Sequence, residues 1–233
     1  MLRAVDPTLA GRITVVIAAK NEAPSIEDVV RRCLAMADAV LVVDGRSTDG
    51  TAEAAVRAGA TVLTQKGAGK GGAIREAIPR VCTPITVFID ADGSHVPEDI
   101  PRLVQPIVDG TADHVSASRL MGGSSELHGG FDEFLRLTGS SFITACINWR
   151  FNVRLSESQN GFRAVRTAFL QTLTLTAGST TIEQEMIIRT LRAGARIAEV
   201  PSHEYCRQFG SSHIRLWRAA PQYVYSLIRH LLF

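Results

Sequence analysis

The chain has 233 residues, of which 45% are hydrophobic and 21% are charged, and its formal net charge is +2. This is the composition of a globular protein, and the length suits one large α/β domain or at most two small ones. A charge so near neutral does not favour a nucleic-acid-binding protein. The four cysteines form no CxxC pair, so we expect reduced thiols in a cytoplasmic protein rather than a zinc site or a disulfide scaffold.

The two ends of the chain bear on membrane association. The first twelve residues are polar and broken by Pro7 and Gly11, unlike a signal peptide. No apolar run reaches the roughly 18 residues of a membrane span. From Tyr205 to Phe233 there are four arginines and no acidic residue, and the stretch from Trp217 onward has the pattern of an amphipathic helix. This favours an anionic surface or a phosphate ligand, although a solvated, docking or dimer-forming helix face explains it equally well.

Short apolar runs alternate with helical patterns along the chain. Predicted strands cover 13–19, 40–44, 61–65, 85–89, 113–118 and 196–200. Predicted helices start with a cap at Ser25 and continue at 48–57, 71–79, 140–151 and 182–191, and 122–130 is predicted to be a mobile loop. Strands and helices in this order predict a mostly parallel sheet with helices on both faces. Ligands bind such sheets at the carboxyl ends of the strands, where 20–22, Asp44, Asp90 and Asp92 fall.

The triplet Asp90-Ala91-Asp92 is the sharpest chemical feature. Two carboxylates one residue apart at a strand end suit Mg²⁺ or Mn²⁺ shared with a diphosphate. Such triplets also occur by chance in loops. The buried strand before this one fixes its acids at the edge of the sheet, which favours a metal site.

The glycine-rich segment 67–72 surrounds Lys70 at a predicted helix start. Free backbone N–H groups there would attract phosphate, although a flexible loop with a solvated lysine is the simpler explanation. It is not a P-loop, because Gly71 stands where Ser or Thr is needed. A GxGxxG motif after the first strand is also missing, which argues against a Rossmann dehydrogenase.

Three arginines and two glutamates complete the candidate residues. Arg119, Arg163 and Arg207 each lie near glycine- or serine-containing turns, which together favour an anion site. Glu183 and Glu185 begin a predicted helix. Either could act as a general base toward a hydroxyl, or simply favour the helix dipole.

Taken together, these segments resemble family 2 glycosyltransferases, and within them the dolichyl-phosphate mannose synthase-like branch. The resemblance runs from Ile13 to about Arg218. It is carried by ITVVIAAKNE, VLVVDGRSTDGT, KGGAIREAI, FIDADGSHVPEDIPRLV, SASR, QNGFRA, IEQEMIIR and EVPSHEYCRQFGSS.

The resemblance implies a glycosyltransferase-A fold and sugar transfer with inversion. Glu22 would touch the ribose, Asp44 the base, and Arg207 the diphosphate. The candidate nucleotide-binding residues are Ala18, Glu22, Asp44, Lys70, Gly71, Asp90 and Ala91, with Lys70 and Gly71 taken from the glycine-rich segment. The implied metal ligands are Asp90 and Asp92. The candidate acceptor-binding residues are Arg119, Arg136, Ser140 and Gln159, and the candidate catalytic residues are Asp92, Arg119, Glu183 and Arg207, with Glu183 chosen as a possible base from its own position rather than from the resemblance.

Two departures from the family pattern matter. The usual Asp-Asp-Gly-Ser turn is Asp44-Gly45-Arg46-Ser47 here, which leaves GDP-, UDP- and dTDP-sugars open as donors. Ser94 replaces a glutamine that relatives often place beside the metal.

The first hypothesis is therefore a hexosyltransferase that moves a sugar onto a polyprenyl phosphate. It would have a catalytic domain over 1–213 and an amphipathic helix over 214–233 that rests on the inner face of the membrane. The alternative keeps the donor but uses a hydroxyl acceptor of a soluble metabolite, with Glu183 or Glu185 as base. A sugar nucleotidyltransferase would need a glycine-rich run with arginine where the chain has AAKNEAPS, and a non-catalytic nucleotide-binding protein would not need Asp90 and Asp92. A homodimer is compatible with the apolar helix, and we expect no nucleic-acid partner.

Overall fold

The computed structural model describes residues 12–125, 131–207 and 216–232, apart from the side chains of 131–136, 216–219 and 232. The strands are β1 (Ile13–Ala19), β2 (Ala39–Asp44), β3 (Thr61–Thr64), β4 (Ile85–Asp90), β5 (His114–Ser118), β6 (Arg163–Arg166) and β7 (Ile197–Pro201). They form one seven-stranded sheet in the order β3-β2-β1-β4-β6-β5-β7. Only β6 runs antiparallel to its neighbours in this sheet. The prediction of a mostly parallel sheet is confirmed.

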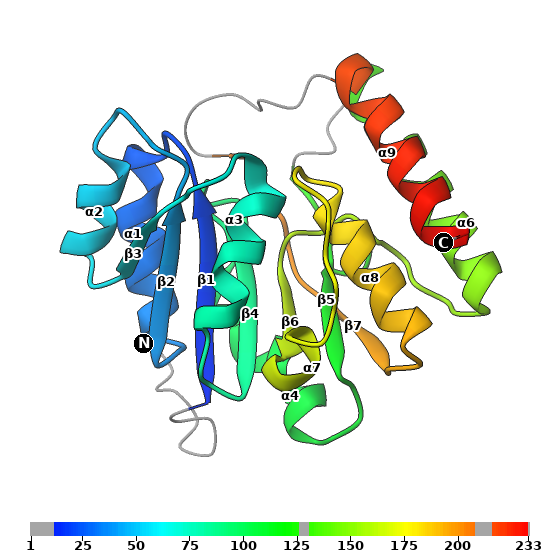
Figure 1. Ribbon diagram of the computed structural model, residues 1–233, viewed down its shortest axis with the longest axis horizontal. Coiled ribbons are helices and arrows are strands. Elements are labelled where there is room, and N and C mark those ends of the chain that lie inside the picture. Colours follow the sequence, from blue (N-terminus) through cyan, green and yellow to red (C-terminus); the bar gives the residue numbers. More distant parts are fainter. Residues whose placement is uncertain (1–11, 126–130, 208–215, 233) are drawn as a thin grey trace.

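Helices cover both faces of this sheet (Figure 1). They are α1 (Ala23–Leu34), α2 (Thr51–Arg57), α3 (Gly69–Ala77), α4 (Ile100–Val108), α5 (Arg119–Gly122), α6 (Phe131–Phe151), α7 (Thr167–Leu170), α8 (Ile182–Arg192) and α9 (Leu216–Leu232), with 3-10 turns η2 (Ile78–Arg80) and η3 (Pro97–Asp99). Successive strand residues point to opposite faces. Val15 and Ile17 accordingly pack with α1, α2 and α4, whereas Val16 packs with α3, α7 and α8.

A third apolar cluster lies beside the sheet, where α6, α8 and α9 meet. Ile147 on α6, Ile188 on α8 and Leu227 on α9 are buried against one another. Figure 1 shows α6 and α9 side by side at the end of the molecule beyond β5 and β7. Within the described ranges, no helix is both long enough and apolar enough to cross a bilayer.

The structure differs from the sequence-based expectations at several elements. Strand β6 was not expected, because its pattern RAVR has arginines at both ends. Helix α6 starts at Phe131 rather than at 140, and α2 starts at Thr51, after Gly50 in the left-handed conformation. Ser25 lies inside the first turn of α1 rather than at its cap, and its hydroxyl donates to the carbonyl of Ala91 at 2.8 Å. Of the predicted loop at 122–130, residues 126–130 lie outside the described chain.

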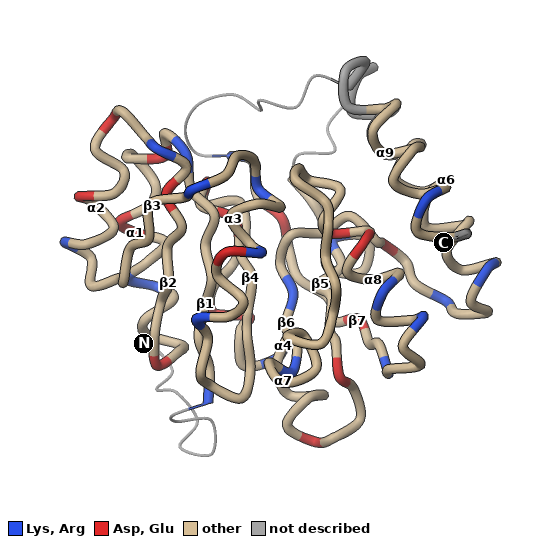
Figure 2. Tube along the Cα trace, in the orientation of Figure 1, with Lys and Arg blue, Asp and Glu red and all other residues tan. Residues whose placement is uncertain are grey.

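The strand register brings the predicted acids to one edge. Ala18 near the end of β1 pairs with Asp90 of β4, and Ala19 pairs with Asp44 of β2. The two aspartates therefore flank the carboxyl end of the central strand. Figure 2 shows residues of both charges next to one another at this edge.

Candidate functional site

One ion-pair cluster joins three elements at the carboxyl edge of the sheet. The guanidinium of Arg207, which follows β7, contacts Asp92 Oδ2 at 2.9 Å and Glu22 Oε1 at 3.2 Å. Asp92 Oδ1 accepts from the backbone N–H and the hydroxyl of Ser94, at 3.0 and 2.7 Å. Residues 22, 92 and 207 are far apart in the chain, yet the fold brings all three predicted donor-site residues together. The two hydrogen bonds from Ser94 also fix the orientation of the Asp92 carboxylate.

A second cluster surrounds Asp90. The Lys70 ammonium at the start of α3 lies 2.5 Å from Asp90 Oδ1 and 2.7 Å from Glu183 Oε1 on α8. His95 Nε2 lies 3.7 Å from Asp90 Oδ2. Burial works to raise the pKa of Asp90, but the charge of Lys70 and the proximity of His95 outweigh it and hold that pKa well below its usual range. Asp90 is therefore a carboxylate at neutral pH, and Lys70 is its counter-ion.

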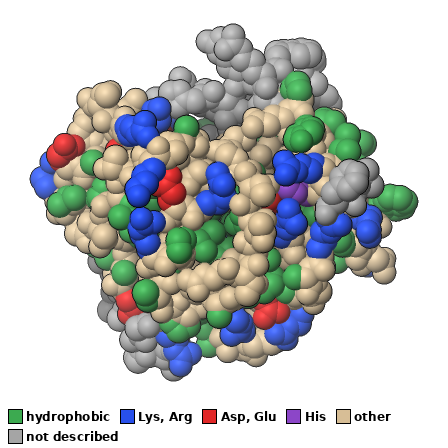
Figure 3. Space-filling model, viewed as in Figure 1, with side chains coloured by type: hydrophobic (Ala, Val, Ile, Leu, Met, Phe, Trp, Pro, Cys, Tyr) green, Lys and Arg blue, Asp and Glu red, His purple; other side chains and the backbone are tan. Residues whose placement is uncertain are grey.

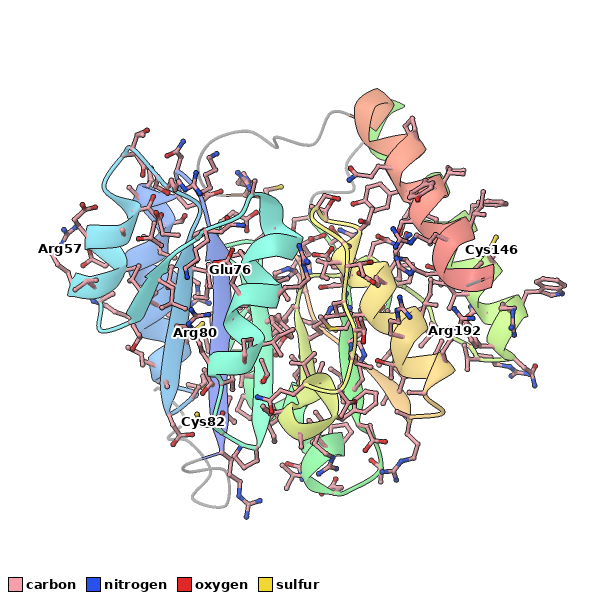
Figure 4. All side chains as sticks on the ribbon, in the orientation of Figure 1. Arg57, Glu76, Arg80, Cys82, Cys146 and Arg192 are labelled. Atoms are coloured by element: carbon pink, nitrogen blue, oxygen red, sulfur yellow. The ribbon has the colours of Figure 1, made fainter. Side chains whose placement is uncertain are left out.

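Glycines allow close packing around the second cluster. A Cβ on Gly161 would lie 2.7 Å from Asp90 Oδ2 and 2.9 Å from Lys70 Nζ. A Cβ on Gly69 or Gly71 would lie 2.2 or 2.3 Å from a backbone oxygen of the segment 177–178. The loop before α3 is held in turn by Glu76, labelled in Figure 4, whose carboxylate accepts from the N–H groups of Lys66 and Gly67. Close packing is therefore one reason for glycine at these positions, and a phosphate site at 67–72 stays a prediction.

Asp44 is the last residue of β2, and only one of its carboxylate oxygens has a hydrogen-bond partner among the described residues. Oδ2 accepts from the Ser47 backbone N–H at 3.0 Å. Oδ1 is buried and has no hydrogen-bond partner among the described residues. Buried polar atoms are usually satisfied, so this oxygen calls for a donor from elsewhere.

The predicted acceptor side begins at Arg119, directly after β5. Its guanidinium contacts Glu157 Oε1 at 2.6 Å and Glu204 Oε2 at 2.7 Å. Burial raises the pKa of Glu157, and the charge of Arg119 acts against that rise. Arg119 therefore bridges two acids that the sequence did not single out.

The other predicted acceptor residues lie on or beside α6. Gln159 Nε2 donates to Ser158 Oγ and to Gln184 Oε1, each at 3.3 Å. Gln159 Oε1 is buried without a partner in the described part of the chain. Ser140 is half-buried on α6, and the side chain of Arg136 lies outside the described residues.

Two interpretations are corrected by the structure. Arg163 is fully buried and donates to the carbonyls of Asn160 and Glu183, so it forms no anion site. Glu185 is fully buried, and its two oxygens accept from Thr176 and from the Ala177 backbone N–H at 2.7 to 3.0 Å. A carboxylate so enclosed cannot serve as the base for an acceptor. Glu183 keeps one buried oxygen, Oε2, with no partner among the described residues.

Sequence reasoning missed the two acids that pair with Arg119. Glu157 lies outside the strings that carry the resemblance, Glu204 lies inside one without being singled out, and both become notable only because the fold places them on Arg119. The one available signal was their type, since glutamate is rarely buried unless it is paired.

The chemistry of the site suits a shared metal rather than a metal held by protein alone. Asp90 and Asp92 offer hard carboxylate oxygens at the sheet edge. Among the described residues, no group of three or more His, Cys, Asp or Glu side chains is placed to hold a metal ion. A bound diphosphate would offer further oxygen ligands to a metal held by these two carboxylates.

Comparison with solved structures supports the fold. The glucosyl-3-phosphoglycerate synthase from Mycobacterium tuberculosis, in complex with Mn²⁺, uridine diphosphate and phosphoglyceric acid, aligns with a TM-score of 0.79 at 25% identity, over 96% of this chain and 80% of that one. A complex of the same enzyme with Mg²⁺ and uridine diphosphate aligns with a TM-score of 0.78 at 24% identity, over 97% and 82%. The glycosyltransferase-A fold expected from the sequence is confirmed.

Sequence relatives point the same way. The glycosyltransferase AglJ of Haloferax volcanii is 34% identical over 82% of this chain, and the alignment spans 62% of its own length. The dolichyl-phosphate hexose transferase of the same organism is 29% identical over 81% of each chain. The profile of glycosyl transferase family 2 matches residues 14–173, which is more than half of the chain. The chain belongs to glycosyl transferase family 2.

Proposed function

We propose that this protein transfers a sugar, with inversion, from a nucleotide-diphosphate sugar to a polyprenyl phosphate. The observation that carries the proposal is the meeting of Glu22, Asp92 and Arg207 beside Asp90 at the sheet edge. Carboxylates for a metal and a guanidinium for a diphosphate are the groups that this donor requires. The similarity to a dolichyl-phosphate hexose transferase supports the acceptor class.

Asp90 and Asp92 would hold Mg²⁺ or Mn²⁺ together with the donor diphosphate. The metal would supply positive charge opposite the leaving nucleoside diphosphate. Arg207 already lies 2.9 Å from Asp92, so its guanidinium is positioned to bind the same diphosphate. Lys70 acts through Asp90, because it holds that carboxylate in place from the first turn of α3.

The other residues proposed to bind the donor lie along the same edge of the sheet. Ala18, Asp90 and Ala91 lie at the ends of β1 and β4, where a nucleotide would cross the sheet edge. Glu22 at the start of α1 would reach the ribose, and Asp44 the base. Gly71 would contribute by letting α3 pack close to this edge.

On the acceptor side, Arg119 would bind the phosphate together with Arg136, Ser140 and Gln159. A phosphate acceptor is already ionised, so no strong base is needed. Catalysis would rest on in-line positioning and on charge stabilisation of the leaving group. Arg119 would exchange one of its two carboxylate partners for the acceptor phosphate.

A hydroxyl acceptor is the second candidate, favoured by one observation. Glu183 Oε2 is buried without a partner in the described chain, as expected of a base awaiting a substrate proton. The structural neighbour with phosphoglyceric acid bound takes a soluble molecule rather than a lipid.

Replacing Glu183 by glutamine separates the two acceptors. Glutamine keeps an oxygen for the 2.7 Å contact to Lys70 but cannot accept a proton from a substrate. With polyprenyl phosphate as acceptor, we expect turnover within about threefold of the wild type, because no base is used. A loss of about 10² or more with intact donor binding would instead establish base catalysis toward a hydroxyl. Glu53→Gln, on the exposed surface of α2, is the matched control.

The α6–α9 surface, defined by exposed Phe142, Trp149, Val224, Tyr225 and Ile228, would rest on an anionic membrane. The segments 134–156 and 205–233 contain no acidic residue. Exposed arginines surround the surface at positions 150, 154, 192 and 229. Figure 3 shows apolar and basic side chains together at this end of the molecule. Apolar groups flanked by arginines bind at the headgroup level of anionic bilayers.

The proposed location is the cytoplasmic membrane face, with 214–233 as an appended helix on a catalytic domain of 1–213.

Vesicle flotation tests this surface. The wild type should float with phosphatidylglycerol vesicles and not with phosphatidylcholine vesicles, and Ile228→Glu should reduce flotation about tenfold. Val56→Glu is the control, because Val56 is equally exposed but lies on α2. If Ile228→Glu instead abolishes a concentration-dependent dimer and leaves flotation unchanged, the surface is a homodimer interface.

A further inference from the structure

We infer that Tyr223 on α9 is a positioning residue for the acceptor side of the site. It holds the start of α8 at two points, and through Gln184 it sets the orientation of the Gln159 amide. This inference rests on the proposed function, which places Gln159 on the acceptor side. It gives α9 a role in the reaction that is separate from its exposed surface.

The first turn of α8 carries three consecutive polar side chains that are buried. Glu183 is 4% exposed, and Gln184 and Glu185 are fully buried. Buried polar groups are costly unless they are paired. The cap residue Thr181 makes no side-chain hydrogen bond to the described residues of the helix start. The position of this turn therefore depends on contacts from other elements.

Other parts of the fold hold two of these three side chains. Glu183 Oε1 contacts the Lys70 ammonium on α3 at 2.7 Å. Glu185 accepts hydrogen bonds from residues 176–177. Gln184 instead faces α9, which packs beside α8 (Figure 1). The middle side chain of the turn is therefore held by the C-terminal helix.

Tyr223 contacts the start of α8 through both its main chain and its side chain. Gln184 Nε2 donates to the Tyr223 carbonyl at 3.2 Å. The Tyr223 hydroxyl donates to Thr180 Oγ1 at 2.7 Å. Leu227 and His230, four and seven residues further along α9, are buried on the same face of the helix. The contact is therefore made by the inner face of α9 and not by the α6–α9 surface.

The hydrogen bond to α9 also fixes the amide of Gln159. A backbone carbonyl only accepts, so Gln184 turns Nε2 toward Tyr223 and Oε1 toward Gln159. Gln159 must then present Nε2, which donates to Gln184 Oε1 at 3.3 Å. The same nitrogen donates to Ser158 Oγ at 3.3 Å. The Gln159 amide therefore keeps one orientation while Tyr223 holds Gln184.

Gln159 lies close along the chain to the residues that surround the metal site. Gly161, two residues later, packs so tightly that an added Cβ would lie 2.7 Å from Asp90 Oδ2 and 2.9 Å from Lys70 Nζ. Small displacements near reacting groups lower the rate of transfer. Loosening the start of α8 should therefore impair use of the acceptor through Gln159.

Steady-state transfer from a nucleotide sugar to polyprenyl phosphate tests the Tyr223 hydroxyl bond from both of its ends. Tyr223→Phe and Thr180→Val each remove this bond. At a temperature where every variant is folded, each should lower kcat/KM for the acceptor about fivefold, the size of one uncharged hydrogen bond. The KM of the donor should stay within about twofold. Thr174→Val, which changes an exposed threonine between α7 and α8, is the control and should match the wild type.

The double variant shows whether the two groups act as a pair. Tyr223→Phe combined with Thr180→Val should lose about fivefold in total, because both changes remove the same hydrogen bond. A loss of about 25-fold would mean that the two residues act independently. That result overturns the inference, as does a folded Tyr223→Phe protein within about twofold of the wild type.

Hydrogen exchange tests the same contact without turnover. The Glu185 N–H donates to the Thr181 carbonyl in the first turn of α8. We expect this amide to exchange about fivefold faster in Tyr223→Phe and in Thr180→Val, and at the wild-type rate in Thr174→Val. Unchanged exchange in the folded variants overturns the inference, and Thr180→Val measures the bond if Tyr223→Phe does not fold. If exchange responds but the wild type transfers no sugar from GDP-, UDP- or dTDP-sugars, the proposed function fails while the hold of Tyr223 on α8 stands.

Discussion

At the scale of single residues, the site is built from cations that each bridge two acids. Lys70 joins Asp90 to Glu183, and Arg207 joins Glu22 to Asp92. Arg119 does the same with its two glutamates. Each cation offsets part of the negative charge of the carboxylates that it joins. A diphosphate or phosphate competes with the carboxylates for the cations, which frees carboxylate oxygens for a metal.

Gly161 should be sensitive to a single added methyl group. In Gly161→Ala the Cβ would meet Asp90 and Lys70 within 3 Å, and Asp90 would have to shift. Misplacing a catalytic group by about 1 Å can cost about 10²-fold, so we expect turnover of the nucleotide-sugar donor to fall by about that factor. Initial rates at saturating donor and Mn²⁺ measure it.

Gly178→Ala provides the comparison, because its Cβ would meet nothing within 4 Å. It should retain wild-type turnover. Equal rates for the two alanine variants would show that Asp90 does not need its present position.

The sequence identified the residue types at the site but not their pairing. Asp90, Asp92 and Arg207 could be predicted because they follow recognisable strands or match family motifs. The role of Glu185 could not, since one turn of α8 carries a glutamate at 183 with one oxygen unpartnered among the described residues and a glutamate at 185 with both oxygens hydrogen-bonded. Spacing in the sequence cannot distinguish these two environments, because they differ only in the tertiary contact that Glu185 makes with residues 176–177.

At the scale of elements, Glu185 should stabilise the junction between α8 and the segment 176–177. In Glu185→Gln, an NH₂ group would face backbone N–H donors that now donate to a carboxylate. We expect a loss of about 1–3 kcal/mol of unfolding free energy, measured as a lower urea midpoint with an unchanged slope. Glu53→Gln on exposed α2 should stay within about 0.5 kcal/mol of the wild type. A neutral Glu185→Gln would mean that the junction is held by other contacts.

Strand β5 should make stability depend on pH through His114. Its Nδ1 lies 2.9 Å from the Thr190 hydroxyl, which itself donates to the Met186 carbonyl. Nδ1 is therefore the protonated nitrogen, and buried Nε2 has no partner among the described residues. Burial, followed by the charge of Arg163, holds the pKa of His114 well below its usual value.

When the pKa of a histidine is lower in the folded protein than in the unfolded chain, the unfolded chain binds the proton more readily. Its contribution to stability is present above about pH 6.5 and is lost as the pH falls below that value. Between pH 7.5 and 5.5, the wild type should lose about 1.4 kcal/mol more than His114→Gln, measured by urea unfolding. The difference between the two proteins removes the effects of His95 and His230. If the wild type and His114→Gln lose the same free energy of unfolding over this pH range, His114 is not a buried neutral histidine.

At the scale of the whole molecule, the parallel part of the sheet formed by β1 to β4 was easier to predict from the sequence than the rest of the fold. Strands β1, β2 and β4 are mostly apolar runs and β3 is a short run rich in β-branched residues, so their sequence along the chain and their shared carboxyl edge follow from local pattern. Strand β6 is short and ends in arginines, and its antiparallel insertion between β4 and β5 depends on tertiary pairing. The α6–α9 layer likewise forms through contacts between distant segments.

The central claim is that a divalent cation and the donor nucleotide share the Asp90–Asp92 edge. Titration calorimetry of UDP and GDP, with Mn²⁺ or with EDTA, tests it in the wild type and in Asp92→Asn. For whichever nucleotide binds, Mn²⁺ should tighten binding at least about tenfold in the wild type, a coupling of about 1.4 kcal/mol. That gain should disappear in Asp92→Asn. Equal affinity with Mn²⁺ and with EDTA in the wild type would contradict the account.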